Sequence, residues 1–159
     1  MFDDLNELML QKDKKMLFVG IGNLLKMDDG VGVYISERIK NKGTVASLTV
    51  EVSIENYIGK INSLNPDILV LIDCVDIKKV PGTFKMLSLR QIHDITFNTH
   101  NISLKRLSEF FMMPVYVLGI QPEKIDFGEK ISYLVKNVAN RIINQINKKE
   151  VYHGCRIHL

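Results

Sequence analysis

The chain has 159 residues, a length at which a single domain with a sizeable core is expected. Hydrophobic residues make up 46% and charged residues 25%, a composition typical of a globular protein and not of a disordered or fibrous one. The net charge is only +3 and no block of five or six like charges occurs, so the sequence does not indicate nucleic-acid binding.

Apolar runs alternate with helical patterns along the chain. Within residues 1–14 apolar side chains recur at spacings of three and four, which predicts a short helix in an N-terminal extension (1–15). A single domain (16–150) and a tail (151–159) are expected to follow. The elements predicted in the domain are a strand at 16–20, a helix at 31–40, a strand at 47–53, a short helix at 57–62, a buried strand at 67–75, an edge strand at 82–89, a helix that bears Ile102, Leu104, Leu107 and Phe111, a buried strand at 114–120, and an amphipathic helix from Ile131 to Ile146.

Strands that alternate with helices predict an α/β fold, namely a three-layer α/β/α sandwich around a mostly parallel, roughly five-stranded twisted sheet. Ligands of such folds bind outside the carboxyl ends of the strands. Residues that end or follow a strand are therefore the first candidates for a functional site.

No apolar segment approaches the roughly 18 to 20 residues that span a bilayer, and the N-terminus MFDDLNELML begins with acidic residues, unlike a secretory signal. We therefore expect a cytoplasmic protein without membrane insertion. The two cysteines, Cys74 and Cys155, form no Cys-x-x-Cys pair, and we expect them to be reduced thiols.

The segment GIGNLLKMDDG (20–30) follows the first predicted strand but does not match a nucleotide loop. Leu25 occupies the position at which a dinucleotide fingerprint needs its third glycine. The adjacent acids Asp28 and Asp29 would also repel a pyrophosphate, whereas they would attract a cation. A nucleotide-binding module is therefore the weakest of the functional alternatives.

Helix capping is the structural alternative for Asp28 and Asp29. An aspartate before VGVYISERI would accept backbone N–H bonds, worth about 0.5 to 2 kcal/mol. Capping explains one acid but not two. Capping also does not explain why Gly30 and Gly32 open the helix, at a cost of roughly 1 kcal/mol each relative to alanine. Glycines at these positions would let the backbone of a bulky partner come close.

Two further candidates follow later strands. Asp73 ends the run ILVLID, where it would face a ligand or else tie down the next loop. Strand alternation turns Cys74 to the opposite face, so we expect a buried thiol and not a nucleophile. His100 precedes a helix, whose dipole favours the neutral imidazole that binds metals, although a lone histidine is more often structural. One acid of the pair Asp28 and Asp29, together with Asp73 and His100, would suit a divalent metal with open positions.

Five motifs, GIGNLLKMDDGVG, DILVLIDCVD, PGT, THNISL and LGIQPE, occur in this order between about residues 16 and 147. Their combination resembles the hydrogenase maturation peptidases, which trim the C-terminal extension from the large subunit of nickel–iron hydrogenases once nickel is installed. The resemblance implies an α/β/α sandwich of the phosphorylase/hydrolase-like kind. It also implies a metal-contacting triad that falls on Asp29, Asp73 and His100, with Asp29 and Asp73 as the catalytic carboxylates. Gly119–Glu123 is similar as well, and we expect it to shape the cleft.

The sequence departs from this family at two positions. Asp29 stands where many members carry glutamate, which shortens the side chain by one methylene, and Cys74 stands where alanine is usual. The extension 1–15 and the tail HGCRIHL lie outside the resemblance.

The partner that the resemblance implies is the precursor of a nickel–iron hydrogenase large subunit. The implied metal is nickel carried by that substrate protein, with no bound nucleotide. A non-enzymatic nickel carrier or docking protein that uses the same three side chains is the other functional class. A carrier would bind the metal tightly and leave the precursor uncut.

Overall fold

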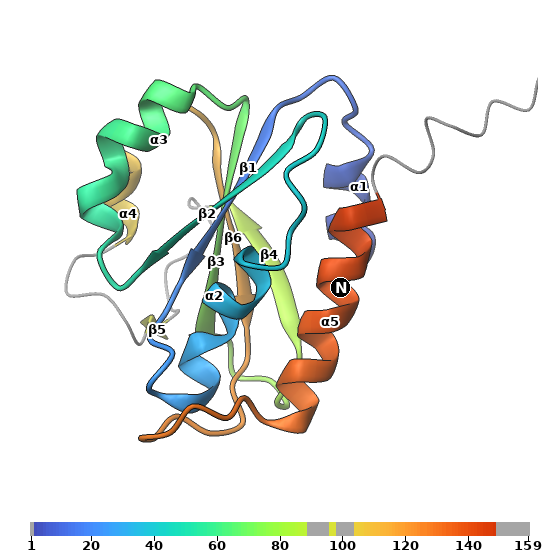
Figure 1. Ribbon diagram of the computed structural model, residues 1–159, viewed down its shortest axis with the longest axis vertical. Coiled ribbons are helices and arrows are strands. Elements are labelled where there is room, and N and C mark those ends of the chain that lie inside the picture. The colour runs from blue at the N-terminus through green and yellow to red at the C-terminus, as the bar shows by residue number, and fades with distance from the viewer. Residues whose placement is uncertain (1, 89–95, 98–103, 149–159) are drawn as a thin grey trace, which may run out of the picture.

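A central sheet with helices on both faces forms the fold of the chain, as the computed structural model shows (Figure 1). The structure describes residues 2–88, 96–97 and 104–148. The elements in chain order are α1 (Phe2–Met9), β1 (Met16–Ile21), η1 (Met27–Gly30), α2 (Val31–Ser36), β2 (Val45–Glu51), η2 (Ile54–Tyr57), α3 (Ile58–Leu64), β3 (Ile68–Asp76), β4 (Phe84–Ser88), β5 (Thr96–Phe97), α4 (Leu104–Ser108), β6 (Val115–Ile120) and α5 (Tyr133–Asn147).

The strand order β2-β1-β3-β6-β4 makes the sheet mostly parallel. β1 pairs in parallel with β2 and β3, and β3 pairs in parallel with β6. The edge strand β4 runs antiparallel to β6, which confirms the edge strand expected at 82–89. The short strand β5, which the sequence did not predict, pairs antiparallel with the end of β3.

Two hydrophobic clusters fill the space between the sheet and its helices, which confirms the three-layer sandwich. On one face, side chains of α1, α2 and α5 pack on the sheet, and on the other face η2, α3 and the segment around α4 do so. Figure 1 shows α3 and α4 on one side of the sheet and α5 on the other. Cys74 is buried in the cluster with α2 and α5, as expected from strand alternation. No helix in the described ranges is long and apolar enough to cross a membrane.

The N-terminal helix α1 is part of the core. The helix predicted within residues 1–14 ends at Met9, and its side chains Leu5, Leu8 and Met9 are buried against the sheet and α5. The ring of Phe2 makes an edge-to-face contact with Phe84 of β4, at 4.8 Å between centroids. These contacts join the first residues of the chain to the edge strand.

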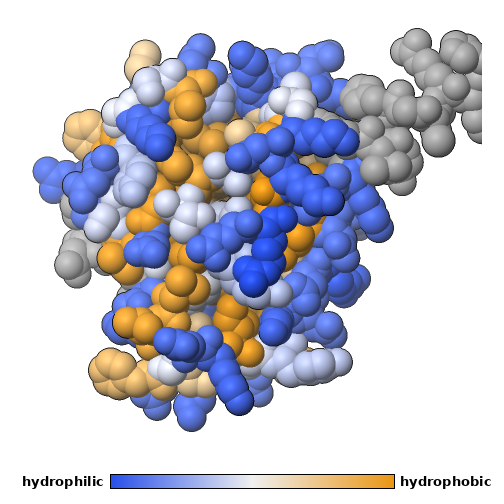
Figure 2. Space-filling model, in the orientation of Figure 1, coloured by the Kyte–Doolittle hydropathy of each residue, from blue (hydrophilic) through white to orange (hydrophobic). Residues whose placement is uncertain are grey.

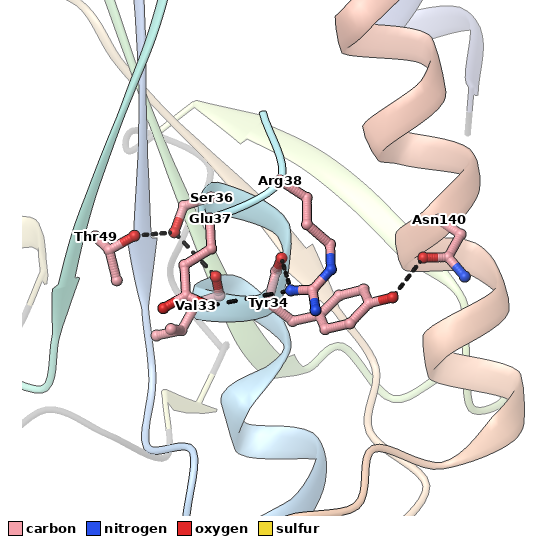
Figure 3. A network of polar contacts seen from close by, with 7 residues as sticks. All are labelled: Val33, Tyr34, Ser36, Glu37, Arg38, Thr49 and Asn140. Atoms are coloured by element: carbon pink, nitrogen blue, oxygen red, sulfur yellow. Dashed lines mark hydrogen bonds and ion pairs between the residues drawn. The ribbon is translucent and has the colours of Figure 1, made fainter. Parts of the chain in front are cut away.

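Helix α2 follows the acidic loop directly and is fixed by polar contacts on two sides (Figure 3). The hydroxyl of Tyr34 donates to Oδ1 of Asn140 in α5 at 2.7 Å, and the hydroxyls of Ser36 and Thr49 in β2 lie 2.7 Å apart. The guanidinium of Arg38 lies 3.7 Å from the centroid of the Tyr34 ring. These contacts hold α2 between the sheet and α5.

Helix α2 is shorter than the helix predicted at 31–40, because α5 supplies other partners for the backbone after Ser36. Oδ1 of Asn147 accepts a hydrogen bond from the backbone N–H of Lys40 at 2.9 Å. Its Nδ2 donates to the carbonyl of Arg38 at 3.1 Å. The chain therefore leaves the helical path while its backbone groups stay paired.

Candidate functional site

Asp29 and Asp73 come from neighbouring elements at the carboxyl edge of the sheet. Asp29 lies in η1, which follows β1, and Asp73 lies near the end of β3, with which η1 is in contact. The adjacent strands β1 and β3 pair Gly20 with Ile72, the residue before Asp73. Both side chains are buried, with exposed fractions of 1% for Asp29 and 0% for Asp73.

Two glycines allow this arrangement. A Cβ atom on Gly32 would lie 2.2 Å from the carbonyl oxygen of Ile72 and 2.3 Å from that of Ile21, so the first turn of α2 rests directly on the backbones of β1 and β3. Gly22 has φ +145°, and its Cβ would lie 2.0 Å from the carbonyl oxygen of Asp29. The close approach expected at Gly32 therefore exists, but it is made by the protein's own strands and not by a partner.

A backbone N–H orients each of the two carboxylates. Oδ2 of Asp29 accepts a hydrogen bond from the N–H of Asn23 at 3.1 Å. Oδ1 of Asp73 accepts from the N–H of Cys74 at 2.8 Å. Carboxylates held in this way are suited to two tasks, namely coordination of a divalent ion and removal of a proton from water.

Asp28 has different partners from Asp29. Its Oδ2 accepts hydrogen bonds from the N–H groups of Glu123 and Lys124, both at 2.9 Å. Ser132 donates to the same carboxylate through its N–H, to Oδ1 at 2.6 Å, and through its hydroxyl, to Oδ2 at 2.8 Å. The capping hypothesis is wrong in its mechanism, because α2 has Gly30 at its N-cap and no side chain caps it. The partners of Asp28 lie about a hundred positions later in the chain, and local sequence gives no signal for them.

The residues between β6 and α5, which we name the 121–132 loop, lie beside the loop that carries the two acids. The N–H of Met27 donates to the carbonyl of Gly128 at 2.7 Å, and the N–H of Gly128 donates to the carbonyl of Leu25 at 3.0 Å. The two loops run side by side at the lower end of Figure 1. Backbone hydrogen bonds and the hydrogen bonds to the Asp28 carboxylate therefore join the two loops into one unit.

Gln121, within the segment Gly119–Glu123, ties a third loop to this unit. Its Oε1 accepts a hydrogen bond from the N–H of Ile77 at 2.7 Å. Its backbone N–H donates to the carbonyl of Thr83 at 2.8 Å, and its carbonyl accepts a hydrogen bond from the N–H of Gly82 at 3.0 Å. The PGT motif thus belongs to the same edge of the sheet, and the role of Gly119–Glu123 in shaping a cleft stays a prediction.

Large apolar side chains are exposed on the loops at this edge of the sheet. Figure 2 shows hydrophobic surface at the lower end of the molecule, where these loops lie. The exposed apolar residues on the loops and on the first turn of α5 are Leu24, Leu25, Val80, Ile125, Phe127, Tyr133 and Leu134. Exposed apolar side chains gathered at one end of the molecule are typical of a surface that contacts another molecule.

Asp76, the last residue of β3, is held by Lys78. The hydrogen bond from the Lys78 ammonium at 2.8 Å, and next the one from the Lys78 backbone N–H at 3.1 Å, keep the pKa of Asp76 below its ordinary value. A lowered pKa stabilises the fold above the ordinary pKa of the carboxyl, and this contribution is lost as the pH falls through the folded-state pKa.

We expect Lys78→Ala to raise the pKa of Asp76 toward its ordinary value, because the variant loses the ammonium donor and its charge. NMR titration of the Asp76 carboxyl carbon measures the change. Lys79→Ala is the matched control, since the contact of Lys79 with Oε1 of Gln121, at 3.4 Å, is made by its backbone N–H, which the variant keeps. An unchanged Asp76 pKa in Lys78→Ala would contradict the assignment.

The third member of the expected triad, His100, lies outside the described residues. Within the ranges that the structure describes, no group of three or more His, Cys, Asp or Glu side chains is placed to hold a metal ion. The triad of Asp29, Asp73 and His100 therefore stays a prediction. Its donor atoms, two carboxylates and one imidazole, fit a divalent transition metal.

Comparisons with known proteins agree on one family. A family model described as hydrogenase maturation protease, HycI, matches residues 30–149. A protein of Methanocaldococcus jannaschii, whose name assigns it to the same proteases, is 30% identical over 154 residues, which cover 86% of this chain and 89% of the relative. The crystal structure of the NiFe hydrogenase maturation protease HycI from Thermococcus kodakarensis KOD1 gives a TM-score of 0.81 at 25% identity, over 92% of this chain and 97% of that chain. The solution structure of the endopeptidase HycI from Escherichia coli gives a TM-score of 0.73 at 26% identity, over 86% and 91% of the two chains.

Proposed function

Because the chain belongs to the family of hydrogenase maturation proteases, we propose that it is the endopeptidase that removes the C-terminal extension from the precursor of a nickel–iron hydrogenase large subunit. The observation that carries this proposal is the pair of buried carboxylates, Asp29 and Asp73, at the carboxyl edge of a sheet in a chain of this family. The matched range includes Asp73 and begins one residue after Asp29. A cytoplasmic location stays part of the proposal.

In the proposed reaction the nickel belongs to the substrate. Asp29, Asp73 and His100 contact the nickel that is already bound in the precursor. This contact makes cleavage depend on bound nickel, and it places the scissile peptide beside the metal. A water molecule attacks the peptide carbonyl carbon, and a carboxylate takes the proton of that water as general base. The C–N bond then breaks, and the proton passes to the departing amine. Nickel in this position would polarise the carbonyl or the water.

The nickel dependence predicts cleavage of the loaded precursor only. We expect incubation with a nickel-loaded precursor to release a small C-terminal peptide, and incubation with the nickel-free precursor to leave it intact. The intact mass of the large subunit measures both results. Equal cleavage of the two forms would contradict recognition of nickel while leaving the peptidase assignment in place. Tight binding of nickel by the isolated protein without cleavage would favour the carrier function instead.

A further inference from the structure

Two adjacent aspartates, Asp28 and Asp29, serve different parts of the protein. Asp29 accepts a hydrogen bond from Asn23 within its own loop. In the contacts that the structure gives for the Asp28 side chain, all the donors belong to the 121–132 loop, namely Glu123, Lys124 and Ser132. Asp28 is therefore a side-chain link between the loop that carries the candidate catalytic group and the 121–132 loop, beside the backbone hydrogen bonds of Gly128.

The chemistry of this link requires a carboxylate. Both oxygens of Asp28 act as acceptors, and the groups that face them are N–H donors and one hydroxyl. Hydrogen bonds to an ionised carboxylate are roughly twice as strong as those between neutral groups. An asparagine has the same shape, but its NH2 group would face an N–H donor at one of the two oxygen positions. The site thus distinguishes Asp from Asn.

The link also fixes the position of exposed side chains. The 121–132 loop is held at Glu123 and Lys124, again at Gly128, and finally at Ser132. Between these fixed points it carries Phe127, whose side chain is 88% exposed. Exposed aromatic side chains on a rigid backbone are frequent anchors of protein interfaces, because little conformational freedom is lost when they bind.

We propose that Asp28 is a positioning residue that fixes the 121–132 loop as one side of the site in which Asp29 acts, and that the protein substrate contacts this loop through Phe127. The proposal rests on the proposed function, because it takes the precursor as the substrate. Gly128 is bonded to Met27, two residues from Asp29, so a peptide placed at Asp29 passes beside this loop. Asp28 itself touches no reacting atom.

The test measures KM and kcat for a nickel-loaded precursor of a nickel–iron hydrogenase large subunit. Asp28→Asn is expected to raise KM about tenfold or more with a smaller change in kcat, since the hydrogen bonds that it weakens lie away from the reacting atoms. Ser132→Ala removes one of the four hydrogen bonds and is expected to raise KM about threefold. Phe127→Ala is expected to raise KM about tenfold without loss of thermal stability, because an exposed side chain contributes little to folding.

Matched controls separate positioning from general stability. Asn147→Ala removes a similar side-chain link, between α5 and the backbone of Arg38 and Lys40, far along α5 from the 121–132 loop. It is expected to lower thermal stability and leave KM unchanged. Met112→Ala, at an 83% exposed residue near the opposite edge of the sheet, is the control for Phe127→Ala and is expected to change neither constant.

Each result decides the proposal. Asp28→Asn protein that is less stable but has the wild-type KM would overturn the positioning role, and Phe127→Ala protein with the wild-type KM would overturn the substrate contact. If Asp28→Asn does not fold, the KM values of Ser132→Ala and Phe127→Ala decide the proposal.

Wild-type protein that leaves the loaded precursor uncut would contradict the proposed function. Hydrogen exchange then tests the link between Asp28 and the 121–132 loop without the precursor. Faster exchange of the Glu123 and Lys124 amides in Ser132→Ala supports the link, and unchanged exchange overturns it.

Discussion

Replacing Asp29 or Asp73 by asparagine is expected to slow cleavage of the nickel-loaded precursor by about a hundredfold to ten-thousandfold. An amide cannot take a proton from water, and general-base catalysis contributes a factor in this range. An amide is also a weaker ligand for a divalent metal than a carboxylate. Single-turnover cleavage followed by intact mass of the large subunit measures the rate.

The matched control for these variants is Asp13→Asn. Asp13 is exposed in the turn between α1 and β1, away from the carboxyl edge of the sheet, and its replacement should leave the rate unchanged. His100→Ala tests the third expected member of the triad in the same assay. Full activity in Asp29→Asn or in His100→Ala would show that the triad is assigned to the wrong residues.

The second large effect is expected on stability, at Gly32. Alanine is normally preferred over glycine in a helix by about 1 kcal/mol. At Gly32, however, the added Cβ would meet two backbone carbonyl oxygens, of Ile21 and Ile72, at 2.3 and 2.2 Å, and neither can move without shifting a central strand. We expect Gly32→Ala to lower the free energy of unfolding by roughly 3 kcal/mol or more, as overpacking in a core does. Chemical denaturation with a shared m-value measures this loss.

Gly59→Ala is the matched control, since Gly59 also lies in the first turn of a helix, α3. A Cβ atom there would meet nothing within 4 Å. The same substitution should therefore stabilise the protein by about 0.5 to 1 kcal/mol, through helix propensity and reduced freedom of the unfolded chain. Equal stability of the two variants would refute the steric explanation for Gly32.

Sequence periodicity was sufficient for most of the fold because the central strands β1, β3 and β6 are apolar and almost wholly buried. Every residue from Ile68 to Val75 in β3 is buried, and such a run has no other stable place than the centre of a sheet. The errors lie where tertiary contacts replace local preference. Helix α2 ends at Ser36 because Asn147 supplies partners to the backbone beyond it. The two-residue strand β5 is too short to leave a periodic signal.

The site was predictable only in part, for a physical reason. The end of an apolar run marks Asp73, and a loop after the first strand marks the pair Asp28 and Asp29. That Asp28 binds the 121–132 loop depends on the N–H groups of residues about a hundred positions away, which only the folded chain brings near. Ser132 was not identified as a structural residue for the same reason.

The contact of the first helix with the last has a consequence for how the protein is made. α1 and α5 come from opposite ends of the chain and bury their apolar faces in the same cluster. While residues 133–147 are still inside a ribosome, the sheet face that α5 covers in the folded protein is exposed. Helix α1 then lacks its contacts with α5 and can pack only on the sheet. A nascent chain therefore exposes this apolar sheet face until α5 has left the ribosome, and we expect it to be prone to aggregation up to that point.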